Sequence, residues 1–215
     1  MLIKRFWIDP YQRTLDTRVV AVDGAAVRVA ETICYAFSGG QESDRGTLAG
    51  FEIVEARKDG HDIVYTLPAD HGLAVGPPVR MELDWPRRYR LMRLHFAAEL
   101  VLELLCRLRP GVEKIGAHIA ADKARIDFAL DENVAALFPA IEAEVAAIVA
   151  ADLAIACDFS DEAAQRRYWE IAGLARVPCG GTHPRRTGEI GPIGLRRRNV
   201  GRGKERIEVT LAGAG

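Results

Sequence analysis

The sequence has no hydrophobic run long enough to cross a bilayer, although 49% of its 215 residues are hydrophobic. It also has no segment after Met1 that resembles a signal peptide, because residues 1–10 mix Lys4, Arg5 and Asp9 with short apolar stretches. We therefore expect a soluble globular protein in the cytoplasm, with no membrane partner. The length suffices for one large domain or two small ones.

Cysteine is scarce as well. The sequence has four cysteines, at positions 34, 106, 157 and 179, and their spacing shows no close pairing pattern. Disulfide frameworks are typical of small secreted domains, so we expect reduced thiols here. Free cysteines behave as small hydrophobic residues, which predicts core positions for Cys34, Cys106 and Cys157.

The fourth cysteine opens the compact segment Cys179-Gly180-Gly181-Thr182-His183. Thiolate sulfur and imidazole nitrogen are the donors that zinc prefers, but two ligands do not hold a metal ion. Candidates for the remaining donors are His95 and Glu99, four positions apart in an amphipathic helical pattern, which places them on one face. The four donors together predict a zinc site.

Charge of one sign is not in excess, since the net charge is −1, but the basic residues are unevenly distributed. Residues 184–206 contain eight basic and two acidic side chains. A second cluster directly precedes His95 and consists of Arg87, Arg88, Arg90 and Arg93. Charge runs are usually solvated surface. Two clusters that flank the proposed ligands favour a polyanionic partner.

Residues 1–85 read as strands and turns, and they predict a small all-β domain of the barrel type. A hairpin is expected at Asp23-Gly24 and another at residues 58–60, each between runs rich in β-branched residues. A further strand is expected over residues 32–37, before the glycine turn that carries Gln41.

Residues 86–215 mix helices and strands without regular alternation, which predicts an α+β domain. Asp84 is expected to cap a helix that ends near Leu108. The other expected elements are strands over 114–120, 124–130, 153–157, 190–196 and 206–211, and helices over 131–152 and 160–172.

Several segments, in this order along nearly the whole chain, resemble the alanyl-tRNA editing family, the free-standing relatives of the alanyl-tRNA synthetase editing domain. They are residues 32–46, 83–95, 115–119, 125–128, Cys179–His183 and Thr187–Ile193. The resemblance implies a trans-acting, zinc-dependent deacylase that hydrolyses mischarged tRNA(Ala), chiefly seryl-tRNA(Ala). It also implies an N-terminal β-barrel domain with a Gly-Gly-Gln turn, followed by a metal-binding editing domain with an antiparallel sheet and helices.

The family's metal motif pairs two histidines, four residues apart, with a Cys-x3-His loop. His95, Cys179 and His183 match this motif, whereas Glu99 replaces the second histidine. Phe96 stands where the family commonly has a small or hydroxylated residue. Glu99 can therefore be a fourth metal ligand or a base that orients water, and its position in the motif favours a ligand.

An editing enzyme must spare alanyl-tRNA, which differs from seryl-tRNA by one hydroxyl group, so we expect a polar side chain near the metal to bind that hydroxyl. Gln41 and Thr182 are the two candidates, and the spacing does not choose between them. The side chains expected to contact tRNA are Arg87, Arg88, Arg185, Arg186, Arg196, Arg197 and Arg198.

Two other functions remain open at this point. The chain can be a tRNA-binding module that keeps the fold but has lost the metal chemistry through Glu99 and Phe96. It can also be a zinc hydrolase of the same fold that acts on another aminoacyl ester.

Overall fold

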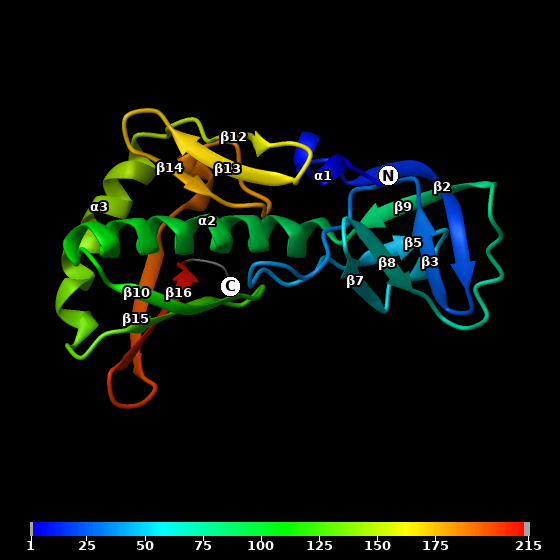
Figure 1. The fold of residues 1–215 in the computed structure, drawn as a ribbon. Helices are drawn as coiled ribbons and strands as arrows, with labels where there is room; N and C mark the ends of the chain where they lie inside the picture. Colours follow the sequence, from blue (N-terminus) through cyan, green and yellow to red (C-terminus); the bar gives the residue numbers. More distant parts are fainter. Residues whose placement is uncertain (1, 213–215) are drawn as a thin grey trace. The chain divides into compact units, whose positions relative to one another are not determined.

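The computed structural model describes residues 2–212 and divides into two compact units (Figure 1). The described residues of the first unit run up to Ser38 and from Glu42 to Tyr89, and those of the second are Gly39–Gln41 and the chain from Arg90 onward. The expected α+β class with mostly antiparallel sheets is confirmed. Within residues 2–212, no helix is both long enough and apolar enough to span a membrane.

The first unit is built mainly from short strands. Its elements are β1 (Ile3–Lys4), α1 (Arg5–Ile8), β2 (Thr14–Asp23), β3 (Ala26–Val29), β4 (Glu31–Thr32), β5 (Gly46–Leu48), β6 (Phe51–Glu52), β7 (Glu55–Asp59), β8 (Asp62–Thr66) and β9 (Pro78–Leu83). Seven strands form one antiparallel sheet in the order β6-β5-β9-β2-β3-β8-β7. The ladders between described residues join these strands in an open row, and the sheet is a curled half-barrel, so the predicted small β-barrel is not confirmed.

The strand expected over residues 32–37 is largely absent, since only Thr32, in β4, is extended and paired. Residues 33–36 are buried, and some of their backbone groups bond to side chains instead, whereas Phe37 is exposed. The Tyr35 N–H donates to Asp44 Oδ2 (2.6 Å), and the Ile33 carbonyl accepts from Arg88 Nη2 (2.6 Å). Because the backbone groups are satisfied in this way, a buried irregular segment costs little.

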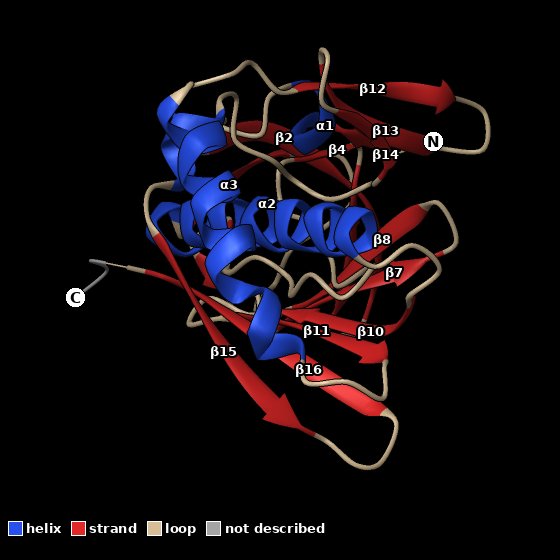
Figure 2. Cartoon of the chain, turned by 90° about the vertical axis from the view of Figure 1, so that its left-hand side faces the viewer, coloured by secondary structure: helices blue, strands red, loops and turns tan. Residues whose placement is uncertain are grey.

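The second unit contains most of the long helix α2 (Trp85–Leu108) and two antiparallel sheets. Its other elements are β10 (Glu113–Ile119), β11 (Ala124–Ala129), the 3-10 helix η1 (Val134–Leu137), α3 (Phe138–Ala150), β12 (Ala156–Asp161), β13 (Arg166–Ile171), β14 (Ala175–Pro178), the 3-10 helix η2 (Thr187–Ile190), β15 (Ile193–Asn199) and β16 (Lys204–Leu211). One sheet has the order β10-β11-β16-β15 and the other the order β12-β13-β14. Helix α2 lies between the two sheets in both views (Figures 1 and 2).

Helix α2 begins where the sequence predicts, because Asp84 Oδ1 accepts a hydrogen bond from the Arg87 N–H (3.1 Å) as a helix cap does. Most apolar positions of α2 in the second unit are buried, among them Leu94 and Leu105, whereas Leu102 is half-buried and Leu108, at the end of the helix, is exposed. They share one core with the inward-facing residues of both sheets, such as Phe128 and Trp169. A residue on this part of α2 is therefore held from two sides.

The helix expected over residues 160–172 is wrong. The chain forms the β12–β13 hairpin there, with Asp161 paired to Arg166. Buried residues alternate with more exposed ones along β13, so that Arg167, Trp169 and Ile171 face the interior. This period of two is a strand pattern, and burial of Trp169 against α2 prevails over local helix propensity.

The helix expected over residues 131–152 forms in two parts. Asn133 caps the short η1, and α3 then starts at Phe138, with Pro139 in its first turn. Pro139 fits the first turn of α3, because the N–H that proline lacks has no partner there in a helix. The expected helix is therefore interrupted between η1 and α3 and is not kinked.

Candidate metal centre

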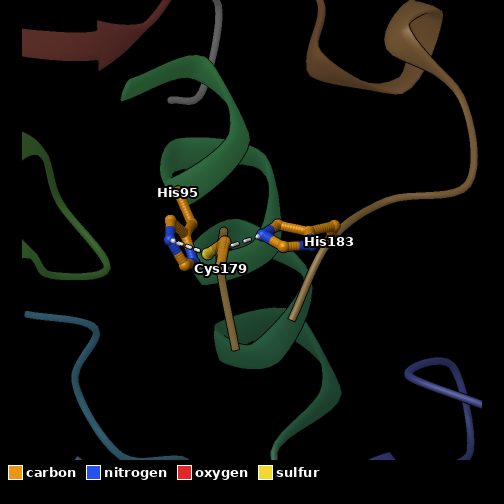
Figure 3. Close-up of side chains that lie close together, drawn as sticks. All are labelled: His95, Cys179 and His183. Atoms are coloured by element: carbon orange, nitrogen blue, oxygen red, sulfur yellow. Dashed lines mark hydrogen bonds between the residues drawn. The ribbon is translucent and has the colours of Figure 1, made fainter. Parts of the chain in front are cut away.

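Three of the four predicted metal ligands meet in the second unit (Figure 3). His95 lies on α2, Cys179 directly follows β14, and His183 is on the loop beyond it. Cys179 Sγ is 3.5 Å from His95 Nε2 and 3.4 Å from His183 Nε2. Both imidazoles are buried and the thiol is half-buried. One donor atom from each residue thus faces a common point.

The loop that carries Cys179 and His183 packs directly on the imidazole of His95. A Cβ atom at Gly181 would lie 2.0 Å from His95 Cε1 and 2.4 Å from its Nδ1, so no side chain fits at this position. The loop is also tied to β13, because the Cys179 N–H donates to the Arg167 carbonyl (2.9 Å). The two glycines therefore have different surroundings, since a Cβ at Gly180 would meet no atom within 4 Å.

Gln41 orients His95 from the side opposite the thiol. Its Oε1 accepts from His95 Nδ1 (2.7 Å) and from the Thr182 N–H (3.1 Å), and its Nε2 donates to Thr182 Oγ1 (2.9 Å). Gly40 allows the turn to approach closely, because its φ is +88° and a Cβ would lie 2.6 Å from the Ala117 carbonyl oxygen. The two residues predicted to read the substrate hydroxyl are thus bonded to each other beside the centre.

His183 is held by a residue that the sequence did not indicate. His183 Nδ1 is 3.3 Å from Cys157 Sγ, on β12. The prediction of a core position for Cys157 is wrong, since the residue is exposed. Cys157 lies close to His183 because of the β12–β13 hairpin, where the sequence predicted a strand followed by a helix. The local sequence around Cys157 therefore did not reveal this contact.

Glu99 lies beside His95 but outside the group of three donors. Its Oε1 is 3.4 Å from His95 Nε2, and its Oε2 accepts from Trp169 Nε1 (3.3 Å). Burial alone would raise the pKa of this carboxyl, but the hydrogen bond from His95 and the charges of both histidines lower the pKa to about 2. Glu99 is therefore ionised at neutral pH.

The three donors strongly perturb one another. Burial would raise the pKa of the Cys179 thiol, yet the facing imidazoles lower it to about 6. Burial would lower the pKa values of the histidines, but the thiolate raises that of His95 to about 9 and contributes to raising that of His183 to about 10. The centre thus pairs the Cys179 thiolate with two protonated imidazoles, and a bound cation would displace the protons of these rings.

The donor set fits zinc. A thiolate and two imidazole nitrogens are typical protein ligands of this metal, and each histidine has its other ring nitrogen engaged, one by Gln41 and one by Cys157. Such outer contacts fix the orientation of ligating imidazoles.

The predicted RNA-contacting arginines have very different surroundings. Arg88 is fully buried, and its Nε donates to Asp44 Oδ1 (2.8 Å), so it does not present its charge to a ligand. Several others form ion pairs, namely Arg87 with Glu42, Arg186 with Asp152, Arg197 with Glu205 and Arg198 with Glu208. Four of the predicted arginines are exposed, namely Arg185, Arg186, Arg196 and Arg198.

The fold and the donor cluster define an α+β protein with a candidate metal centre, and no protein-family model matches the chain. The chain is 30% identical to "Alanyl-tRNA editing protein AlaX-M" of Pyrococcus horikoshii over 223 residues, which cover 98% of both chains. It is 32% identical to the protein of the same name in Methanosarcina acetivorans over 239 residues, 96% of this chain and 97% of that protein. The chain therefore belongs to the alanyl-tRNA editing protein family.

A longer protein matches as well. The chain is 31% identical over 228 residues to "Alanine--tRNA ligase" of Ignicoccus hospitalis, which covers 94% of this chain but only 25% of the ligase. The resemblance of the chain to a segment of the synthetase is thus confirmed.

Proposed function

We propose that the protein is a trans-acting deacylase that hydrolyses mischarged tRNA(Ala), chiefly seryl-tRNA(Ala), with a zinc ion. The observation that carries this proposal is the cluster of His95, Cys179 and His183, within 4.8 Å of one another, in a member of the editing family. Three protein ligands with one open position are typical of catalytic rather than structural zinc.

The side chains divide the chemical work. His95, Cys179 and His183 would hold the zinc ion, which supplies a Lewis acid that makes water a nucleophile at neutral pH. Glu99 would be the base that accepts a proton from the attacking water, because its Oε1 lies 3.4 Å from His95 Nε2 and its Oε2 is held in place by Trp169 Nε1. The bond that breaks is the ester between the amino acid and a ribose hydroxyl.

The contacts of Gln41 and Thr182 suggest a division of roles between them. Both polar atoms of the Gln41 side chain are occupied by His95 and Thr182, so Gln41 is a positioning residue. Thr182 Oγ1 accepts from Gln41 Nε2, and a hydroxyl keeps its own proton for donation. We assign Thr182 as the residue that binds the serine hydroxyl. Thr182→Val should then reduce the preference for seryl over alanyl esters.

The experiment that tests the activity is single-turnover deacylation of seryl-tRNA(Ala) and alanyl-tRNA(Ala), each with and without a zinc chelator. Faster, chelator-sensitive hydrolysis of the seryl ester is expected, and Cys179→Ala should abolish it. If neither ester is hydrolysed in a chelator-sensitive way, the assignment as an enzyme is wrong. Equal rates on the two esters would remove the editing assignment.

For the RNA-binding face we propose Arg196 and Arg198, which are exposed at alternate positions of β15 and therefore point to the same side of the sheet. Arg197 points to the other side of the sheet and is only half-exposed, so it serves as the control; Arg198 also forms an ion pair, with Glu208, but is exposed. Removing one phosphate-binding side chain should reduce the salt slope of tRNA binding by about 0.7–0.9. The Arg196→Ala/Arg198→Ala double variant should therefore show a flatter slope than Arg197→Ala, and equal slopes would contradict this assignment.

A further inference from the structure

Both histidines of the centre have the ring nitrogen that points away from Cys179 occupied, but by different kinds of group. His95 Nδ1 lies 2.7 Å from the amide oxygen of Gln41, whereas His183 Nδ1 lies 3.3 Å from the sulfur of Cys157. We propose that Cys157 is a positioning residue for His183: its sulfur accepts the hydrogen bond of Nδ1–H, which leaves Nε2 free for the metal. This inference rests on the metal centre of the proposed function.

The small sheet β12-β13-β14 places the two sulfur atoms on opposite ends of the same imidazole. Cys157 belongs to β12 and pairs with Trp169 of β13, while Cys179 follows β14 and is bonded through its backbone to Arg167 of β13. His183 Nε2 faces Cys179 Sγ at 3.4 Å. The imidazole is therefore fixed from both ends, by Cys179 of its own loop, which is bonded to β13, and by Cys157 of β12.

The two cysteines have different roles in this arrangement. Only Cys179 has its sulfur within 4.8 Å of a donor nitrogen of each histidine in the described cluster. Cys157 contacts the distal nitrogen of His183 and can therefore affect the metal only through that ring. Removal of such an outer partner typically weakens metal binding by about 10- to 100-fold, and a weak acceptor such as a thiol belongs at the lower end.

The test is zinc affinity, measured by competition with a chromophoric chelator, in the wild type and in Cys157→Ala, Cys157→Ser and Cys106→Ala. We expect about tenfold weaker binding in Cys157→Ala and partial recovery in Cys157→Ser, which retains an acceptor. Cys106→Ala removes a half-buried thiol that lies about three turns beyond His95 on α2, so this variant should bind zinc like the wild type.

A spectroscopic measurement separates positioning from direct ligation. In the cobalt-loaded protein, the thiolate-to-cobalt absorption should keep its intensity in Cys157→Ala, because Cys179 supplies the ligand. A loss of about half of this absorption would overturn the inference by making Cys157 a ligand, as would unchanged zinc affinity in Cys157→Ala. A wild type that binds zinc but hydrolyses neither ester would refute the proposed function while leaving this inference intact.

Discussion

Replacing Gly181 with alanine should disrupt the metal centre without changing any donor atom. The added Cβ would lie 2.0 Å from His95 Cε1, whereas real contacts of this kind are essentially never below 3.0 Å, so the ring or the loop must move by at least 1.0 Å (3.0 − 2.0). A displacement of this size in a site held by several contacts costs about 100-fold in function. Gln41 Oε1, at 2.8 Å from the same Cβ, closes one direction in which the ring could move.

The control is the adjacent substitution Gly180→Ala. It changes the composition of the loop equally, but its Cβ meets no atom within 4 Å. Zinc affinity and single-turnover hydrolysis of seryl-tRNA(Ala) should fall by about 100-fold in Gly181→Ala and by much less in Gly180→Ala. Thermal unfolding of both metal-free variants shows whether the fold survives, since overpacking of this kind costs about 1–3 kcal/mol.

One result would refute the reasoning. If Gly181→Ala is folded and binds zinc as tightly as Gly180→Ala, the close approach of the loop to His95 does not determine the geometry of the centre. The role given to Gln41 would then fail as well, because both contacts define the position of the same ring.

Three further changes test other parts of the structure. Glu99→Gln should lower single-turnover hydrolysis by about 100-fold or more while zinc content is kept, whereas loss of zinc would show that the carboxylate is a ligand. Asp44→Ala leaves Arg88 buried without its counter-ion and should lower the free energy of unfolding in urea by about 3–5 kcal/mol; a change within about 0.5 kcal/mol, roughly the effect of a surface substitution, would contradict this. The hydrogen bond from Arg197 lowers the pKa of Glu205, so Arg197→Ala should be less stable than the wild type at neutral pH, and the difference should vanish as the pH falls through that lowered pKa; a constant difference in stability across this range would be evidence against the pair.

The sequence predicted well those features that depend on neighbouring residues. The start of α2 follows from Asp84 and the hairpin at Asp23-Gly24 from its turn residues, and both are confirmed. The Cys-x3-His segment and the helical position of His95 similarly identified the three donors that meet, because each motif is local.

Other features depend on contacts between distant parts of the chain. Arg87 and Arg88 are equivalent by charge and position, yet only Arg88 is fully buried, because Asp44 lies 44 positions earlier and faces it. No pattern around residue 88 contains that information. In the same way, the hairpin of β12 and β13 brings Cys157 to His183. The short segments that form this hairpin are compatible with either a helix or a strand, and burial of Trp169 against α2 decides for the strand.

Glu99 shows how a carboxylate beside the core is accommodated. A carboxylate so close to the core is costly unless it is paired, and the structure supplies partners on two sides, His95 Nε2 and Trp169 Nε1. Trp169 reaches this point because β13 is a strand whose inward positions face α2. A histidine at position 99 could accept from the Trp169 N–H only through a ring nitrogen that is then lost to the metal. The Trp169–Glu99 contact therefore favours a carboxylate over a histidine at position 99, and this contact depends on the β12–β13 hairpin, which brings Trp169 to α2.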